Sequence, residues 1–251
     1  MHRYFIEVAY KGTNYKGFQI QKNAHSVQAE VQNALSVLFR QTFELTGSSR
    51  TDAGVHALQN YFHFDKDIEV TGKHIYNLNS ILPADVAVKN IYPVSNEAHC
   101  RFDATSREYE YHIYTKKDPF LYDRAYYYPY SINIDLLQQA AGIVMQHKDF
   151  TSFSKRNTQV KTFICNISRS EWFYRDNVLI YSVQSNRFLR GMVRGLVATM
   201  LKVGREQISL DDLKTILRAK DCTKADFSTP PHGLFLIAVN YPEDFLTNEI
   251  N

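Results

Sequence analysis

The strongest constraint on the fold of this chain is an alternation of strand-like and amphipathic helix-like segments that runs along its 251 residues. In the first hundred residues, the apolar pattern predicts strands over 4–10, 59–65 and 87–94. Apolar residues at helical spacing predict a helix over 26–40, with Ser26 as N-cap, and a helix followed by a turn over 71–86. Strands separated by such helices are typical of the α+β class.

The rest of the chain shows the same alternation of predicted strands and helices, although its sequence does not repeat that of the first part. Its predicted elements are a strand over 105–115, a helix over 136–145, a hairpin over 162–186, a helix over 187–204, a short helix from Ser209 and a strand over 233–241. Neither a low-complexity tract nor a flexible linker separates the two parts. We therefore expect two α+β halves, residues 1–104 and 105–251, that share one continuous sheet or a tight interface.

Composition narrows the class of protein further. A chain with 44% apolar and 22% charged residues is typical of a water-soluble globular protein, and its net charge of +3 mildly favours a polyanionic partner. No segment approaches the roughly 20 apolar residues that span a bilayer, and the N-terminus lacks an apolar signal core, so we expect neither membrane insertion nor export. Three scattered cysteines and nine histidines without ligand spacing argue against disulfides and against a metal site, and favour the reducing cytoplasm.

The segment "SSRTDAGVHA" is the first candidate for a site. Asp52 precedes a glycine, Gly54, that permits a tight turn, and Arg50 lies two residues away. An aspartate in this position is commonly a turn former or a cap. A carboxylate beside a guanidinium also stays ionised, as a nucleophile must, so the spacing leaves both interpretations open. His56 next to this segment is expected to be a structural hydrogen-bonding group rather than a base.

A second candidate is the helix predicted over 187–204. On a continuous helix, Arg190 and Arg194 lie at i and i+4 on one face, and each is followed by a glycine that would let a ligand or another backbone come close. The arginines could form a solvated face, bind phosphate or pair with a buried carboxylate. The tyrosine-rich segments over 107–114 and 122–130 also allow two interpretations. Aromatic residues beside basic ones are suited both to packing within a sheet and to stacking on RNA bases.

These segments together resemble a known family, tRNA pseudouridine synthase A, also called the TruA family. "RTDAGVHA" is similar to the most specific motif of that family. Further segments are similar to family segments in the same order: "YKGTNYKGFQIQ", "SVQAEVQNAL", "LNSILPADVAV", "HCRFDATSREYEYHIY", "DFTSF", "NRFLRGMVRGLV" and "STPPHGLFLIAV". The resemblance therefore covers nearly the whole chain.

The resemblance implies a fold and a set of roles. The implied fold has two similar α/β-sandwich halves around a shared, mostly antiparallel sheet with a central basic cleft. Asp52 would be the catalytic nucleophile, Arg194 would pair with it, Tyr109 would contact the target base and Arg50 would handle the flipped nucleotide. The implied enzyme is a homodimer that needs no cofactor and that converts uridines around positions 38 to 40 of the tRNA anticodon stem-loop to pseudouridine.

The residues alone leave two other classes open. An RNA-binding module without activity would keep the tyrosines and arginines but has no reason to keep Asp52. A carboxylate glycosidase would need a second acid as proton donor, and none is evident in the sequence near Asp52. Within pseudouridine chemistry, Asp52 could attack C1′ or C6 or take a proton from C2′, and the C5 proton could leave to Asp52, water or Tyr109.

Overall fold

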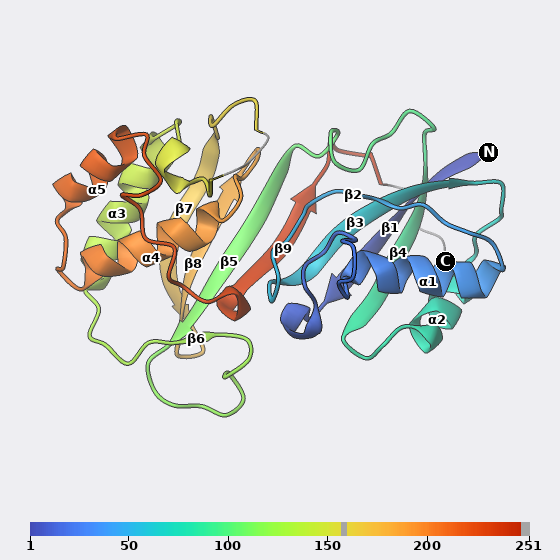
Figure 1. The fold of residues 1–251 in the computed structure, drawn as a ribbon, viewed down its shortest axis with the longest axis horizontal. Coiled ribbons are helices and arrows are strands. Elements are labelled where there is room, and N and C mark those ends of the chain that lie inside the picture. The colour runs from blue at the N-terminus through green and yellow to red at the C-terminus, as the bar shows by residue number, and fades with distance from the viewer. Residues whose placement is uncertain (157–159, 247–251) are drawn as a thin grey trace. The chain divides into compact units, whose positions relative to one another are not determined.

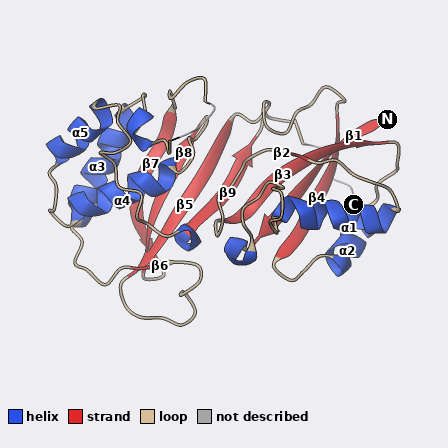
Figure 2. Ribbon diagram, in the orientation of Figure 1, coloured by secondary structure: helices blue, strands red, loops and turns tan. Residues whose placement is uncertain are grey.

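The computed structural model describes residues 1–156 and 160–246. Over these residues it contains five α-helices and nine strands (Figure 2), so the predicted α+β class is confirmed. The chain divides into two compact units, Met1–Thr105 together with the chain from Leu236 onward, and Ser106–Phe235. The predicted second half comprises residues 105–251. In the structure, strand β9 (Leu234–Asn240) lies next to β3 and from Leu236 belongs to the first unit.

The first unit is built on four long strands in the order β4–β1–β3–β9. Besides β9, the strands of this unit are β1 (His2–Tyr10), β2 (Thr46–Gly47), β3 (His56–Lys66) and β4 (Val86–Val94). Its helices are η1 (Gly12–Asn14), α1 (Val27–Phe39) and α2 (Gly72–Ile81). Strand β1 pairs antiparallel with both β3 and β4, and the two-residue β2 pairs antiparallel with β3. In Figure 1, α1 and α2 lie on one face of these strands.

Helix α1 forms where the apolar spacing predicts it. The Ser26 side chain accepts a hydrogen bond from the Ala29 backbone N–H at 3.3 Å, which confirms Ser26 as the N-cap. The buried residues of the helix recur at helical spacing, so one face packs on the sheet: Val27, Val31, Ala34 and Leu35. Arg40 ends the helix in the left-handed region, with φ of 53°.

The second unit has the strand order β5–β8–β7. Its strands are β5 (Ser106–Tyr114), β6 (Tyr126–Tyr127), β7 (Ile167–Arg175) and β8 (Val178–Ser185), and its helices are α3 (Ile134–Gln146), η2 (Thr151–Phe153), α4 (Met192–Gly204), α5 (Leu210–Arg218) and η3 (Pro231–Gly233). Strand β8 pairs antiparallel with β5 and β7, whereas β6 runs parallel to β5. The predicted hairpin is confirmed in β7 and β8, because Asp176 and Asn177 between them both take the positive φ that a tight two-residue turn requires.

One helix prediction is wrong at its start. Helix α4 begins at Met192 and not at residue 187, because Gly191 adopts a φ of 76° that a right-handed helix cannot continue through. Arg190 therefore precedes the helix, and the prediction that Arg190 and Arg194 share a helical face is also wrong. The apolar side of α4 is confirmed, since residues such as Leu196 and Met200 are fully buried.

Helix α5 has a reciprocal hydrogen-bonded cap at its N-terminus. Ser209 caps α5 by accepting a hydrogen bond from the Asp212 N–H at 3.0 Å, and the Asp212 carboxylate accepts in return from the Ser209 N–H at 2.8 Å. This confirms the predicted short helix. Among the described residues, every helix is too short or too polar to traverse a lipid bilayer.

Candidate functional site

Asp52 lies in a tight turn between β2 and β3 of the first unit. The Val55 N–H donates to the Asp52 carbonyl at 3.2 Å, and Gly54 takes a φ of 78°, so the turn requires the glycine that the sequence places there. Asp52 is half-buried, whereas Arg50 is exposed. The turn therefore holds a carboxylate in partial contact with solvent, two residues from an exposed arginine.

Two side chains from the sheet fix the backbone on the N-terminal side of Asp52. The Asn60 amide of β3 donates to the Ser49 carbonyl at 2.7 Å, and the Ser49 N–H donates to the Asn60 amide oxygen at 3.3 Å. The Tyr10 hydroxyl of β1 lies 2.7 Å from the Thr51 hydroxyl. Because these partners are buried, leaving any of them unpaired would cost about 1–3 kcal/mol. The residues around Arg50 and Asp52 are therefore held rigidly.

The segment over 12–18 covers the other side of the turn. The Phe18 N–H donates to the Thr51 carbonyl at 3.1 Å. Gly12 comes so close to the turn that an added Cβ would lie 1.9 Å from the Val55 carbonyl oxygen. The Gly12 N–H also donates to Nδ1 of buried His56 at 3.0 Å, which confirms the structural role expected for this histidine. The glycines of "YKGTNYKGF" thus serve close backbone approach to the Asp52 turn.

In the second unit, Tyr109 lies on β5 and is buried. Its ring packs edge-on against Phe188, with 5.0 Å between the ring centroids. The next residue, Glu110, accepts hydrogen bonds from Arg175 at 2.6 Å and contacts His112 Nε2 at 2.8 Å. Burial opposes ionisation of Glu110, but the hydrogen bonds from His112 and Arg175 outweigh it and lower the pKa of the carboxyl to about 2. The ion pairs fix the strand that carries Tyr109.

Arg194 lies in the first turn of α4, also in the second unit. Its Nε donates to the Thr229 carbonyl at 2.7 Å, and the Thr229 hydroxyl donates back to the Arg194 carbonyl at 2.9 Å. The segment around Thr229 can approach the helix because the next helical residue is Gly195, where a Cβ would lie 2.8 Å from the Phe227 ring. One edge of the Arg194 guanidinium is thereby fixed, and its two terminal nitrogens carry further donors.

Tyr111, two residues after Tyr109 on β5, links this strand to the Arg194 region. Its hydroxyl donates to the Pro230 carbonyl at 2.7 Å. Burial raises the pKa of the Tyr111 phenol, although a contact with Thr229 and the nearby Arg194 charge act in the opposite direction. Since alternate residues of a strand share a face, Tyr109, Tyr111 and the start of α4 belong to the same side of the second unit.

Comparisons with known proteins agree on a single family. The tRNA pseudouridine synthase family matches residues 6–103 and 147–242 of this chain. Proteins called tRNA pseudouridine synthase A from Parabacteroides distasonis and Bacteroides thetaiotaomicron are each 43% identical to it, over 99% of the chain and over 100% and 94% of their own lengths. The protein of the same name from Staphylococcus aureus is 34% identical over 98% of the chain and 95% of its own length. The chain belongs to the tRNA pseudouridine synthase family. This is a family of isomerases.

The two matched ranges of the tRNA pseudouridine synthase family cover the predicted site unevenly. Asp52 and Arg50 lie in the first range and Arg194 in the second, whereas Tyr109 lies between them. The structure places Asp52 and Arg50 on one turn of the first unit, and Tyr109 and Arg194 on one side of the second unit. That all four act on one nucleotide is a prediction from the sequence.

Sequence reasoning missed the residues that hold the Asp52 turn and Arg194 in place. Asn60 and Thr229 carry the key hydrogen bonds to the Asp52 turn and to Arg194, and both lie in segments interpreted only as a strand or as part of a resemblance. A polar residue inside an apolar strand, such as Asn60 in "QNYFHF", is a usable signal, because a buried amide must find hydrogen-bond partners.

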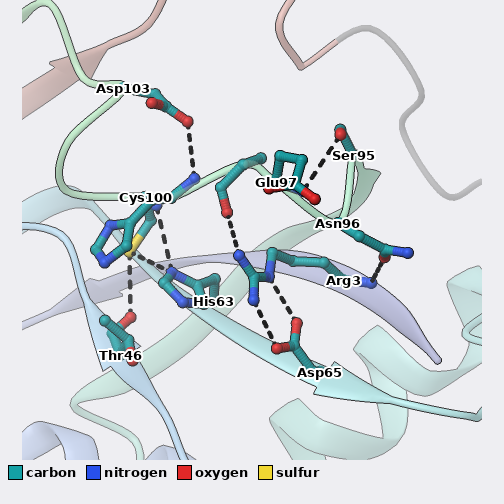
Figure 3. A network of polar contacts seen from close by, with 11 residues as sticks. Arg3, Thr46, His63, Asp65, Ser95, Asn96, Glu97, Cys100 and Asp103 are labelled. Carbon is teal, nitrogen blue, oxygen red and sulfur yellow. Dashed lines mark hydrogen bonds and ion pairs between the residues drawn. The ribbon is translucent and has the colours of Figure 1, made fainter.

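Three potential metal-ligand side chains also meet in the first unit. Ligand atoms of His63, His99 and Cys100 lie within 4.8 Å of one another. Figure 3 shows the hydrogen bonds that join Cys100 to the sheet: its thiol lies 3.2 Å from His63 Nδ1 and 3.1 Å from the Thr46 carbonyl. The spacing of the histidines along the sequence gave no indication of this group. The absence of a metal site stays a prediction.

Proposed function

We propose that this protein isomerises uridine to pseudouridine in the anticodon stem-loop of tRNA, around positions 38 to 40, with Asp52 as the nucleophile. The observation that carries the proposal is the clamped turn, in which Asn60 and Tyr10 hold the backbone beside a half-buried Asp52. A nucleophile that must reach one carbon of a bound nucleotide gains from such fixed geometry. The relatives named tRNA pseudouridine synthase A supply the reaction.

The reaction changes no oxidation state and loses no atom of the nucleoside except an exchangeable hydrogen. The N1–C1′ bond of uridine breaks, the base turns, and a C5–C1′ bond forms. The hydrogen on C5 leaves as a proton, and N1 ends with a proton. The chemistry therefore calls for a nucleophile and a proton acceptor and for no redox cofactor. Attack of Asp52 on C1′ or C6, or proton removal from C2′, all satisfy this balance.

The target base has to leave the stacked anticodon arm before Asp52 can reach it. Extruding a base costs a few kcal/mol, which the protein has to supply through contacts with the flipped nucleotide. We assign the displacement of the base to Arg50, which is exposed and adjoins the fixed turn. We assign stacking on the flipped uracil to Tyr109, because its ring is already fixed by Phe188.

Arg194 is proposed to pair with Asp52 and to keep it ionised and aimed. The support is chemical: the hydrogen bond from Nε to Thr229 orients the guanidinium while leaving its terminal nitrogens as donors for a carboxylate. Asp52 and Arg194 come from different units, so catalysis on this proposal requires the two units to present them to the same nucleotide.

Two further properties belong to the proposal. A homodimer would let one tRNA contact two chains, and sedimentation of the purified protein at twice the chain mass would support it. A cytoplasmic location agrees with the three cysteines, Cys100, Cys165 and Cys222, none of which forms a disulfide. A single-chain mass that persists in the presence of tRNA would contradict the dimer.

The test of the proposal is release of tritium from tRNA that carries [5-³H]uridine. Wild-type protein should release tritium, and Asp52→Asn should reduce the rate at least about 1,000-fold while tRNA binding changes less than about threefold. Asp67→Asn is the matched control, because Asp67 is an exposed carboxylate of the same unit and its replacement alters the charge equally. Turnover of Asp52→Asn close to wild type would overturn the nucleophile assignment.

The same assay separates the other classes of function. An RNA-binding module releases no tritium, with or without Asp52. A glycosidase also fails to release it by this route and instead frees uracil, which chromatography of the products detects. Mapping of pseudouridine in the product tRNA then tests the assignment to positions 38 to 40.

A further inference from the structure

A pocket opens in the first unit next to Arg50, and Arg50 is the only one of its lining residues to which the proposed chemistry assigns a role. Its volume is about 190 Å³, and ten residues line it: Phe18, Gln19, Gln28, Leu45, Thr46, Gly47, Arg50, His99, Arg101 and Phe102. Two of these side chains are guanidiniums and two are amides. None of the ten described lining residues carries a carboxylate. The pocket therefore favours an anionic ligand with hydrogen-bonding edges.

The inner wall of the pocket is rigid. The buried Phe18 ring stacks on Phe62 with 4.4 Å between centroids and an interplanar angle of 7°. Gly47 leaves room for that ring, because a Cβ at this position would lie 2.4 Å from it. The Gln28 side chain joins two segments of the wall by accepting from the Ile20 N–H at 3.0 Å and donating to the Leu45 carbonyl at 2.7 Å.

The outer wall is the segment over 95–103, and its backbone is tied to the sheet at several points (Figure 3). Arg3 donates to the Ala98 carbonyl at 2.8 Å while its other nitrogens pair with Asp65 at 2.6 Å. The Cys100 N–H donates to His63 Nδ1 at 3.3 Å. Arg101 and Phe102 therefore follow a segment whose position is set before any ligand arrives.

Phe102 is presented to solvent instead of being packed into the core. Its side chain is 74% exposed, and one side of the ring rests on His99, with 4.2 Å between the ring centroids. The Arg101 guanidinium lies 5.8 Å from the centroid of the same ring. An exposed ring supported from behind and flanked by a cation is the arrangement on which single-stranded nucleic acid bases stack.

We propose that this pocket binds a second nucleotide of the RNA substrate, distinct from the uridine that reacts. Its base stacks on Phe102, and its phosphate lies between Arg50 and Arg101. This inference rests on the proposed function, since it takes the occupant to be RNA. The pocket volume is below the roughly 300–1,000 Å³ of sites for larger ligands, which suits an occupant no larger than a single nucleotide that is only partly enclosed.

The second nucleotide must lie close to the target along the RNA. Arg50 lines the pocket and Asp52 is two residues further along the chain, so their Cα atoms are separated by at most about 7 Å. Asn60 holds the backbone at Ser49, next to Arg50, so Arg50 and Asp52 lie on one clamped segment. The pocket would thus hold the RNA in register while the neighbouring uridine turns.

The experiment compares full-length variants for tRNA affinity and for single-turnover pseudouridine formation. Phe102→Ala should weaken tRNA binding about 5- to 100-fold, while the rate at saturating protein changes less than about threefold. Phe102→Trp should restore binding, because a larger ring still offers a face for stacking. Tyr76→Ala is the matched control: Tyr76 is 76% exposed, lies on α2 of the same unit, and should leave affinity unchanged.

The phosphate contact is tested through salt dependence. Arg101→Gln should lower the slope of log Kd against log salt concentration by about 1, whereas Lys73→Gln, an equal loss of charge on α2, should leave the slope unchanged. The proposal is wrong if Phe102→Ala binds tRNA like wild type, or if it loses the saturating rate without losing affinity. This experiment measures binding, so it still tests the pocket if the wild-type protein releases no tritium. Such a lack of tritium release would count against the proposed function alone.

Discussion

Asn60 of β3 and Ser49 of the loop before the Asp52 turn form a reciprocal pair: the side-chain amide donates to the Ser49 carbonyl at 2.7 Å, and the Ser49 N–H donates to the amide oxygen at 3.3 Å. The same amide nitrogen lies 3.2 Å from the Tyr10 hydroxyl, which in turn contacts Thr51. One buried side chain therefore connects two strands of the sheet to both residues that flank Arg50.

The first prediction concerns this connection. Asn60→Ala should lower the free energy of unfolding by about 1–3 kcal/mol, because it leaves buried backbone groups unpaired, and should also lower kcat about 10-fold or more. Asn79 makes the same reciprocal pair with Val88, at 2.9 and 2.8 Å, away from the turn. Because the Asn79 side chain is exposed, Asn79→Ala should reduce stability in urea denaturation by less than Asn60→Ala does, and it should leave kcat unchanged. Equal kcat values for the two variants would contradict a positioning role for Asn60.

A second prediction uses two glycines with opposite surroundings. Gly12→Ala should destabilise the protein by more than about 2 kcal/mol, since its Cβ would lie 1.9 Å from the Val55 carbonyl oxygen and force the Asp52 turn away. In Gly142→Ala, nothing lies within 4 Å of the added methyl group, and the residue is inside α3. This variant should gain about 0.5–1 kcal/mol from helix propensity. Thermal unfolding of both variants measures these two changes in stability.

A third prediction concerns Arg194. Arg194→Lys keeps the charge but loses the Nε hydrogen bond to Thr229 and the planar fork, so we expect kcat to fall about 10- to 100-fold while tRNA affinity stays within about threefold. Arg218→Lys, on the exposed end of α5, is the control and should behave like wild type. Full activity of Arg194→Lys would show that any cation suffices at this position.

Local signals account for the parts of the fold that the sequence predicted well. The Ser26 cap, the short helix from Ser209, the apolar stripe of α4 and the hairpin turn at Asp176 and Asn177 depend on residues within a few positions of one another. For such elements, side-chain spacing and backbone preference decide the structure.

The parts that the sequence did not predict depend on contacts between distant segments. Helix α4 starts late because Gly191 turns in the left-handed region, where the Lys155 N–H reaches the Arg190 carbonyl at 3.0 Å. The pocket wall depends on Arg3 reaching Ala98, across 95 positions of the chain. Neither contact leaves a periodic pattern in the sequence. The roles of Asp52 and Arg194 came from family resemblance, and their pairing stays a prediction.

A fourth prediction concerns metals. We expect dialysis against a chelator to leave activity unchanged, because the Cys100 thiol already has hydrogen-bond partners in His63 and the Thr46 carbonyl. Elemental analysis of the purified protein should give well under one zinc ion per chain. One tightly held ion per chain, lost together with activity in Cys100→Ala, would instead assign a metal to the group formed by His63, His99 and Cys100.

The last prediction is a pH dependence of stability that originates at His63. Burial, the neighbouring His99 and the Arg3 charge lower the pKa of its imidazole to about 4, against about 6.5 in an unfolded chain, and Asp65 and Asp103 only partly oppose them. Between these two values the unfolded state binds more protons than the folded state. The free energy of unfolding should therefore fall as the pH decreases from about 6.5 to 4.

Urea denaturation at pH 7.5, 6, 5 and 4 measures this dependence, and one proton allows a slope of at most about 1.4 kcal/mol per pH unit. His63→Asn keeps an acceptor for the Cys100 N–H but does not titrate, so its stability should fall less than that of wild type over this range. Because His63 anchors the segment that carries Phe102, tRNA affinity of the wild type should decrease over the same range more than that of the variant. Parallel pH profiles for the two proteins would mean that His63 is not the titrating group.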